Sequence, residues 1–365
     1  MKKLIGLLLL CTFIMYGCQS MEAISIDYMQ PAKITFPSEL KRIGIVNNVP
    51  TNMPIRIADR YKDVDQSDIN RDGALRQTKY FNGDAKKATE ALAQSIADEN
   101  YFDLVIICDS ALRQHDTRYR NGGLTSEEID QLTSDLGVDA IISLESVQFR
   151  EVREIGYIPD FNIYMGDVQL NVFSTTRVYF PGHGGPVAVI NGNDSIYWNE
   201  AGNFSFVKSA LVSEEEMLKQ ASDFAGTLAV KFLLPYWTTS QRYYFTSGNV
   251  KMRDATVKVS ENKWDEALSM WTDVFHSTDN ARKQCYAAYN IALGYEMQDS
   301  IETAYHWCET AVEKARVAEK IPADITGLRA ENAQLFMLTQ SYLANLEKRK
   351  EEQEDIRSQL VRFKE

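Results

Sequence analysis

Residues 89–110, TEALAQSIADENYFDLVIICDS, contain two patterns of apolar residues in succession. Leu92 and Ile96 belong to a three- to four-residue spacing that predicts a helix over residues 84–100. Residues 104–108 then form an apolar run, which is typical of a strand covered on both faces. The stretch therefore predicts a helix followed by a buried strand, as in an α/β sheet domain.

Segments on either side extend this order. Residues 43–48 predict a short strand that ends in polar turn residues. A second helix is expected to begin at Thr125 or Ser126 and to end at Gly137, because hydroxyls cap helix N-termini and glycine often follows the C-terminus. Residues 138–144 predict the next strand. The order strand–helix–strand–helix–strand predicts a sheet with helices on both faces.

Other patterns fill the rest of this half. Residues 49–83 are polar and rich in aspartate, so we expect a long loop. Residues 162–180 and 187–198 predict two strands joined by the loop 181–186, PGHGGP, as a hairpin. Residues 213–234 predict a helix that begins with the capping sequence SEEE.

The segments LKRIGIVNN and LTSDLGVDAIISLESVQF, with the opening stretch, resemble a known domain. It is the N-terminal α/β domain shared by TolB, the curli secretion lipoprotein and the lipoprotein activators of penicillin-binding proteins. The resemblance covers roughly residues 30–235. It implies a role in assembly at the periplasm or outer membrane, and no shared catalytic site.

The C-terminal third has helical spacing throughout. Residues 262–274 resemble the second half of a tetratricopeptide repeat, with packing positions at Trp264, Ala267, Trp271 and Val274. The pattern returns after the 37 residues from Ala267 to Ala304, against about 34 in such repeats. A third helical unit is expected from about residue 325 to 363. We therefore expect an all-α, tetratricopeptide-like helical module after the α/β domain.

Repeats of this kind often bind an extended peptide along the inner face of their first helices. In the second repeat that face would present Tyr286, Tyr289, Asn290, Leu293 and Glu296. Tyrosines and an amide are plausible peptide contacts. The alternative is that the α/β domain or the C-terminal helix already covers this face.

The N-terminus carries a basic pair, Lys2-Lys3, and then an apolar run from Leu4 to Tyr16. As a helix this run reaches only about 20 Å, which is short of a bilayer core of roughly 30 Å. The sequence Met15-Tyr16-Gly17-Cys18 resembles the bacterial lipoprotein signal, which is cut before a diacylated cysteine. We expect lipid on Cys18 to anchor the mature chain.

These patterns divide the chain into four parts: a lipoprotein signal peptide at 1–17, a tether at 18–29, the α/β domain at 30–245 and the helical domain at 246–365. The resemblance implies the outer membrane. Several acidic residues just after the lipidated cysteine would favour display on the cell surface, but Gln19 to Glu22 contain only one carboxylate, so the periplasmic face is favoured. Display on the cell surface stays open, as do the leaflet and the oligomeric state.

Composition limits the partners. Removing residues 1–17 with two lysines takes the net charge from −12 to −14, so nucleic acid is not an expected partner. Cys285 and Cys308 lie on neighbouring predicted helices, and whether they pair stays open. Residues 68–73 match the first six positions of a calcium loop, but Lys79 occupies the twelfth. We expect no metal and no cofactor, and leave open a cation in the acidic loop 63–72.

No constellation of nucleophile, base and carboxylate is evident, and no G-x-S-x-G occurs. With its export signal, the strand end DSIYWNE at 194–200 and the stretch YNIALGYE at 289–296, the whole chain resembles a lipoprotein family of the Bacteroidetes whose domain has no assigned function. We therefore expect a non-enzymatic, membrane-anchored adaptor or regulator of envelope assembly that binds an envelope protein or peptide segment. The alternatives are a subunit of an outer-membrane secretion pore and a periplasmic hydrolase with an unrecognised site.

Overall fold

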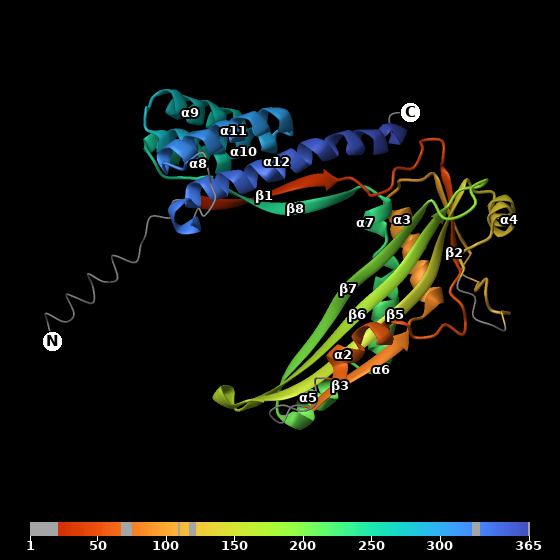
Figure 1. The fold of residues 1–365 in the computed structure, drawn as a ribbon. Helices are drawn as coiled ribbons and strands as arrows, with labels where there is room; N and C mark the ends of the chain where they lie inside the picture. Colours follow the sequence, from red (N-terminus) through yellow and green to blue (C-terminus); the bar gives the residue numbers. More distant parts are fainter. Residues whose placement is uncertain (1–20, 67–74, 109, 117–121, 323–328, 364–365) are drawn as a thin grey trace. The chain divides into compact units, whose positions relative to one another are not determined.

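The computed structural model describes residues 21–66, 75–108, 110–116, 122–322 and 329–363 (Figure 1). The chain divides into two compact units. The sheet unit comprises Ala32–Pro235 and Gln359–Glu365, and the helical unit comprises the residues up to Pro31 and Tyr236–Ser358. The predicted fold class, an α/β domain followed by a helical region, is confirmed.

A mixed six-stranded sheet forms the centre of the sheet unit. Its strands are β2 (Arg42–Asn47), β3 (Leu75–Asn82), β4 (Leu104–Cys108), β5 (Ala140–Ile158), β6 (Ile163–Tyr179) and β7 (Ala188–Gly202). The order is β4-β2-β5-β6-β7; the first three strands are parallel and the last three antiparallel. β3 pairs with the C-terminal half of β5, beyond the end of β2.

Helices pack on both faces of this sheet, as predicted. The helices of the unit are α2 (Ile57–Gln66), α3 (Ala85–Asp98), α4 (Ser126–Leu136), α5 (Phe204–Ala210), α6 (Glu214–Thr227) and α7 (Val230–Leu233). The apolar face is covered by α3, α5, α6 and α7. On the opposite face, α4 packs over Ile141 and Tyr179, and the ring of Tyr61 in α2 contacts that of Phe173.

The predicted helix ends agree with the local chemistry. Asp84 caps α3 through the backbone N–H of Lys87, and Thr125 forms a capping box with Glu128 at the start of α4. Gly137 ends α4 with φ +63°, a left-handed conformation that glycine adopts at little cost. The helix predicted over residues 213–234 is instead two helices, α6 and α7.

The prediction of a loop over residues 49–83 is wrong in part, because α2 and β3 lie within it. In the first turn of α2 only Ile57 is buried, so no apolar spacing revealed the helix. β3 is stabilised by its antiparallel pairing with β5, whose second half was not predicted either. Backbone pairing with a distant strand leaves no apolar pattern in a strand that stays partly exposed.

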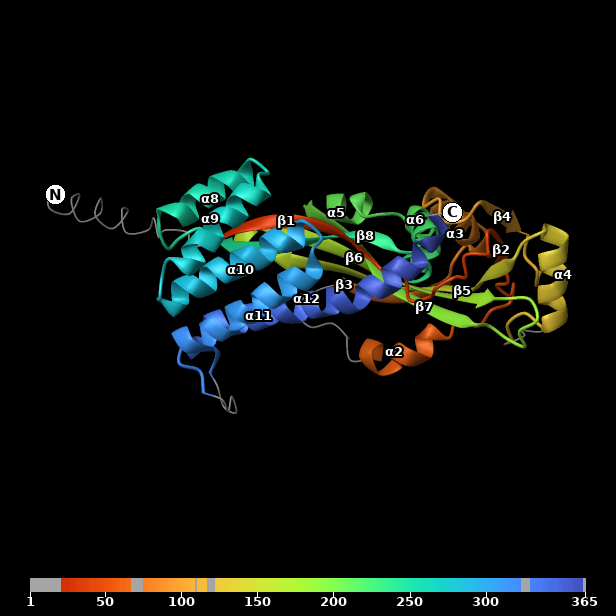
Figure 2. The same cartoon turned by 90° about the horizontal axis from the view of Figure 1, so that it is seen from above.

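The helical unit contains a two-stranded antiparallel ribbon of β1 (Met21–Gln30) and β8 (Tyr236–Phe245). Its helices are α8 (Val250–Ser260), α9 (Trp264–His276), α10 (Ala281–Met297), α11 (Ile301–Ala318) and α12 (Gln334–Gln359), seen from above in Figure 2. Residues 21–29 therefore form a strand where a tether was predicted. β8 also belongs to this unit, whereas the predicted α/β domain extended to residue 245.

The last residues of the chain belong to the sheet unit. The side-chain amide of Gln359 accepts a hydrogen bond from the backbone N–H of Ala32 and donates one to its carbonyl, both at 2.9 Å. The guanidinium of Arg362 lies 4.0 Å from the ring centre of Tyr101. It also donates to the carbonyls of Phe36, Pro37, Leu40 and Tyr101. The predicted assignment of all of 246–365 to one helical domain is thus wrong at its C-terminal end.

Candidate functional site

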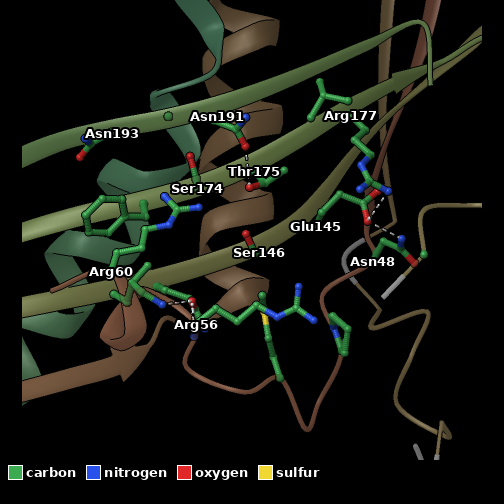
Figure 3. Close-up of a pocket in the computed structure, with 18 residues that line it drawn as sticks. Asn48, Arg56, Arg60, Glu145, Ser146, Ser174, Thr175, Arg177, Asn191 and Asn193 are labelled. Atoms are coloured by element: carbon green, nitrogen blue, oxygen red, sulfur yellow. Dashed lines mark hydrogen bonds and ion pairs between the residues drawn. The ribbon is translucent and has the colours of Figure 1, made fainter. Parts of the chain in front are cut away.

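A polar pocket of about 420 Å³ lies on the sheet face that carries α4 and α2. Figure 3 shows Arg56, Arg60 and Arg177 around it, with Ser146 and Thr175 between them. Its other polar lining residues are Asn48, Glu145, Gln148, Ser174, Asn191 and Asn193. The described lining thus carries three guanidinium groups and one carboxyl, in a chain with a net charge of −12.

Gln148 fixes one wall of the pocket. Its side-chain oxygen accepts from the backbone N–H groups of Arg56 (3.1 Å) and Ile57 (3.4 Å). Its nitrogen donates to the carbonyl of Pro54 and to the side chain of Asn82, both at 2.8 Å. Because this buried amide holds the backbone that enters α2, it positions Arg56, which directly precedes the helix, and Arg60 in its first turn.

A β-bulge forms the opposite wall. Leu144 pairs with Thr176 and Ser146 with Thr175, so Glu145 is the extra residue of β5. Bulges re-aim side chains, and here two consecutive residues, Glu145 and Ser146, both line the pocket. The bulge also shifts the alternation of side chains along β5. Before it the even-numbered Leu144 faces the apolar core, and after it the odd-numbered Val147 does.

The Glu145 carboxyl is held by a hydrogen-bonded network. It accepts from Asn48 Nδ2 at 2.8 Å and from the Tyr179 hydroxyl at 3.2 Å, and Arg177 Nη1 lies 3.9 Å away. Burial raises the pKa of Glu145 above its usual range, against the effect of these hydrogen bonds. Burial likewise raises the pKa of Tyr179, so its hydroxyl stays protonated and donates.

The buried Arg113 holds Asn48, one of the hydrogen-bond donors to Glu145. Arg113 Nε donates to Asn48 Oδ1 at 2.6 Å, and its two terminal nitrogens donate to the two oxygens of Glu128 at 2.6 and 3.0 Å. The hydrogen bond with Glu128 raises the pKa of Arg113. Bidentate pairs of this kind fix geometry as well as charge. Asn48 therefore presents its amide to the pocket in one orientation.

The floor of the pocket consists of side chains from three neighbouring strands. Ser146, Thr175 and Asn191 form one cross-strand row, and Gln148, Phe173 and Asn193 form the next. Thr175 Oγ1 donates to Asn191 Oδ1 at 3.1 Å, and Phe173 supplies an apolar surface. Such a floor can bind hydroxyl groups while the arginines at its rim bind an anion.

Four of the five side chains predicted to bind a peptide contact an extended segment, but it is the chain's own β8. Asn290 accepts from the backbone N–H of Phe245 at 2.8 Å and donates to its carbonyl at 2.7 Å. The ring of Tyr286 stacks on that of Phe245 with 4.0 Å between ring centres. Tyr289, Asn290, Leu293 and Glu296 are all buried. The prediction of an open peptide groove at these residues is therefore wrong, because the helical unit fills it.

Glu296 is the centre of a buried ionic cluster in the same unit. Its carboxylate accepts from Arg242 at 3.0–3.2 Å, from Arg349 Nη1 at 2.6 Å and from the Tyr342 hydroxyl at 2.7 Å. Arg349 also lies over the ring of Tyr28, at 4.4 Å from its centre. The cluster joins β1, β8, α10 and α12, so its role is structural.

The remaining predictions concern the cysteines, metal binding and the membrane anchor. Cys285 and Cys308 are free and buried, and burial raises the pKa of Cys285 to about 12. Among the described residues no group of His, Cys, Asp and Glu could hold a metal ion, and none of their helices is long and apolar enough to span a membrane. Cys18 and the calcium-like residues 68–73 lie outside the described residues.

The pocket was not predicted, because its residues are dispersed over the segment 48–56 and over α2, β5, β6 and β7. The one available signal is the two-residue period of polar side chains in two predicted strands, at Thr175 and Arg177 and at Asn191 and Asn193. Arg56 and Arg60 gave no signal, because the helix that Arg56 precedes and that contains Arg60 was not predicted.

Two family models match the chain. A domain of unknown function (DUF8603) matches residues 40–245, and a second domain of unknown function (DUF6340) matches residues 253–348. The search of curated proteins found no match. The first match covers β2 through β8, and the second covers most of the helices from α8 to α12.

Proposed function

The chain belongs to the family of the domain of unknown function DUF8603, and we propose that it is a membrane-anchored, non-enzymatic adaptor of the bacterial envelope. Lipid on Cys18 would hold it at the outer membrane, on the periplasmic side. The resemblance to the α/β domain of TolB and the curli secretion lipoprotein supports this location and a role in envelope assembly.

One observation carries the proposal: the pocket on the sheet unit has the chemistry of a binding site. Its described lining combines three arginines with four side-chain amides, and it includes one carboxyl group. The described lining contains no histidine, cysteine or lysine that could activate its serine and threonine hydroxyls, and its one carboxyl, Glu145, accepts hydrogen bonds from Asn48 and Tyr179. Amide groups fixed by hydrogen bonds, with guanidinium groups beside them, can hold a ligand in one orientation, which supports binding over catalysis.

The exposed end of the same sheet face is the surface we assign to the envelope partner. Tyr197 on β7 is 65% exposed. It continues the two-residue period of Asn191 and Asn193, so it lies on the same face of the sheet as the pocket. The inner face of α10, predicted to bind the partner, is filled by β8 and is not part of this proposal.

Photo-crosslinking in the native host tests the adaptor function. A benzophenone amino acid in place of Tyr197 is expected to give one discrete adduct with an envelope protein, because a partner on this face lies within reach. The matched control is Val257 on α8, which is 53% exposed in the helical unit. The proposal is contradicted if position 197 gives no adduct, or only the adducts that position 257 also gives.

A further inference from the structure

We propose that the pocket binds an anionic saccharide, that is, a sugar ring that carries a carboxylate or a phosphate. This inference deepens the proposed function by naming a ligand class for the same site. It rests on that function only in treating the pocket as a binding site, and not on the lipid anchor or on a protein partner.

The charge of the pocket selects an anion. Arg56, Arg60 and Arg177 line it, whereas the chain as a whole has a net charge of −12. Arg60 is exposed, and no ion pair or hydrogen bond joins it to another residue that the structure describes, so a ligand can reach its guanidinium. Guanidinium groups match the geometry of carboxylate and phosphate oxygens.

The floor of the pocket selects a polyhydroxylated ligand. Thr175, Asn191 and Asn193 offer donors and acceptors at neighbouring positions of β6 and β7. Asn191 and Asn193 are exposed, so their amide groups can exchange water for ligand hydroxyls. A simple inorganic anion would use the arginines and leave these groups unused.

An apolar surface completes the match. Phe173 lines the pocket between Gln148 and Asn193 in the cross-strand row, and its ring centre lies 6.0 Å from that of Tyr61. The C–H faces of a sugar ring pack against aromatic side chains, which contribute apolar area without needing hydrogen bonds. An acidic peptide would also satisfy the arginines, but it brings few hydroxyls to the amide floor.

The walls are already rigid, which favours a small ligand. Gln148 makes four hydrogen bonds, and Glu145 and Asn48 are held by the network that runs to Arg113. A pocket that is formed in advance loses little side-chain entropy on binding. Its volume of about 420 Å³ falls within the range of roughly 300–1,000 Å³ for small-molecule sites.

Calorimetric titration of the full mature chain in detergent tests the inference. The probes are digalacturonic acid, glucose 6-phosphate, glucose, inorganic phosphate and a tetrapeptide of glutamate. At least one anionic sugar is expected to bind about tenfold or more tightly than glucose, inorganic phosphate or the peptide. Comparison of the two anionic sugars shows whether the pocket prefers carboxylate or phosphate.

Variants separate specific binding from general attraction. Arg60→Ala is expected to weaken binding of the anionic sugar about tenfold or more, as for loss of one charge-assisted hydrogen bond. Asn193→Ala is expected to weaken binding of the anionic sugar and to leave the affinity for inorganic phosphate unchanged. The control is Arg253→Ala, which removes an exposed arginine of the helical unit.

The inference is overturned if neither anionic sugar binds, if the glutamate peptide binds as tightly, or if Arg60→Ala has no larger effect than Arg253→Ala. These measurements use purified protein and soluble probes. Loss of the in-cell adduct at position 197 would contradict the adaptor function and leave the sugar result standing. If the adduct at position 197 forms but no anionic sugar binds, only the saccharide proposal is overturned.

Discussion

Glu296→Ala is expected to destabilise the helical unit by about 3–5 kcal/mol, the range for breaking a buried ion pair by removing one partner. The Glu296 side chain is fully buried, and Arg242 and Arg349 are at most 10% exposed. Without the carboxylate, Arg349 keeps its contact with the exposed Asp299 at 3.5 Å, and Arg242 keeps the carbonyl of Gln241. Tyr342 loses the acceptor of its buried hydroxyl.

Guanidinium unfolding followed by far-ultraviolet circular dichroism measures this effect, because the helical unit contributes strongly to the helical signal. The matched control is Glu302→Ala, which removes a glutamate of the same unit whose partners Lys350 and His306 are exposed. Exposed ion pairs contribute little, so the control should unfold close to the parent. Equal midpoints for Glu296→Ala and the parent would show that the cluster does not hold β8 and α12 in place.

Trp271→Ala is expected to cost the helical unit about 3–5 kcal/mol, the range for truncating a large aromatic side chain in a core. Trp271 is fully buried in the core formed by the helices and the ribbon. It packs close to Gly294 of α10, where a Cβ atom would lie 3.4 Å from the indole ring. The cavity left by alanine cannot close without moving α10.

Two comparisons isolate the packing contribution in the same denaturation assay. Trp271→Phe should lose much less stability, because the indole N–H has no hydrogen-bond partner among the described residues. Trp264→Ala should also lose less, since Trp264 is only partly buried and its N–H bonds Asn262 near the surface. A loss for Trp264→Ala as large as for Trp271→Ala would contradict this account of the core.

Much of the sheet unit could be predicted from the sequence because its signals are local. The apolar runs at 43–46 and 104–108 are β2 and β4, and the caps at Asp84 and Thr125 mark helix starts where they were expected. Residues 162–180 and 187–198 correspond to β6 and β7. Each of these elements carries its own pattern of apolar or capping residues.

The missed elements depend on partners far away in the sequence. β1 is stabilised by pairing with β8, more than 200 residues later, and only Ile26 of its residues is buried. The prediction that Asn290 and Glu296 bind a partner's peptide was wrong, because they hold the chain's own β8. Their partners, Phe245 and Arg242, lie 45 and 54 residues earlier in the chain, so the sequence did not reveal that the strand is internal.

The pocket depends on features that no local pattern encodes. A single unpaired residue, Glu145, re-aims the side chains of β5, and a bulge of this kind is seen only in the register of the paired strands. Gln148 gave no signal either, since its importance lies in four hydrogen bonds to residues of the α2 approach and β3. The pocket therefore forms only when strands β5, β6 and β7 pair in this register.

The proposed function requires lipid on Cys18 to hold the chain at the outer membrane. Labelled palmitate, supplied to cells that produce the parent or Cys18→Ala, tests it most directly. The account predicts that the parent incorporates label and fractionates with the outer membrane, whereas Cys18→Ala incorporates none and leaves that fraction. Equal labelling and equal fractionation of the two proteins would contradict it.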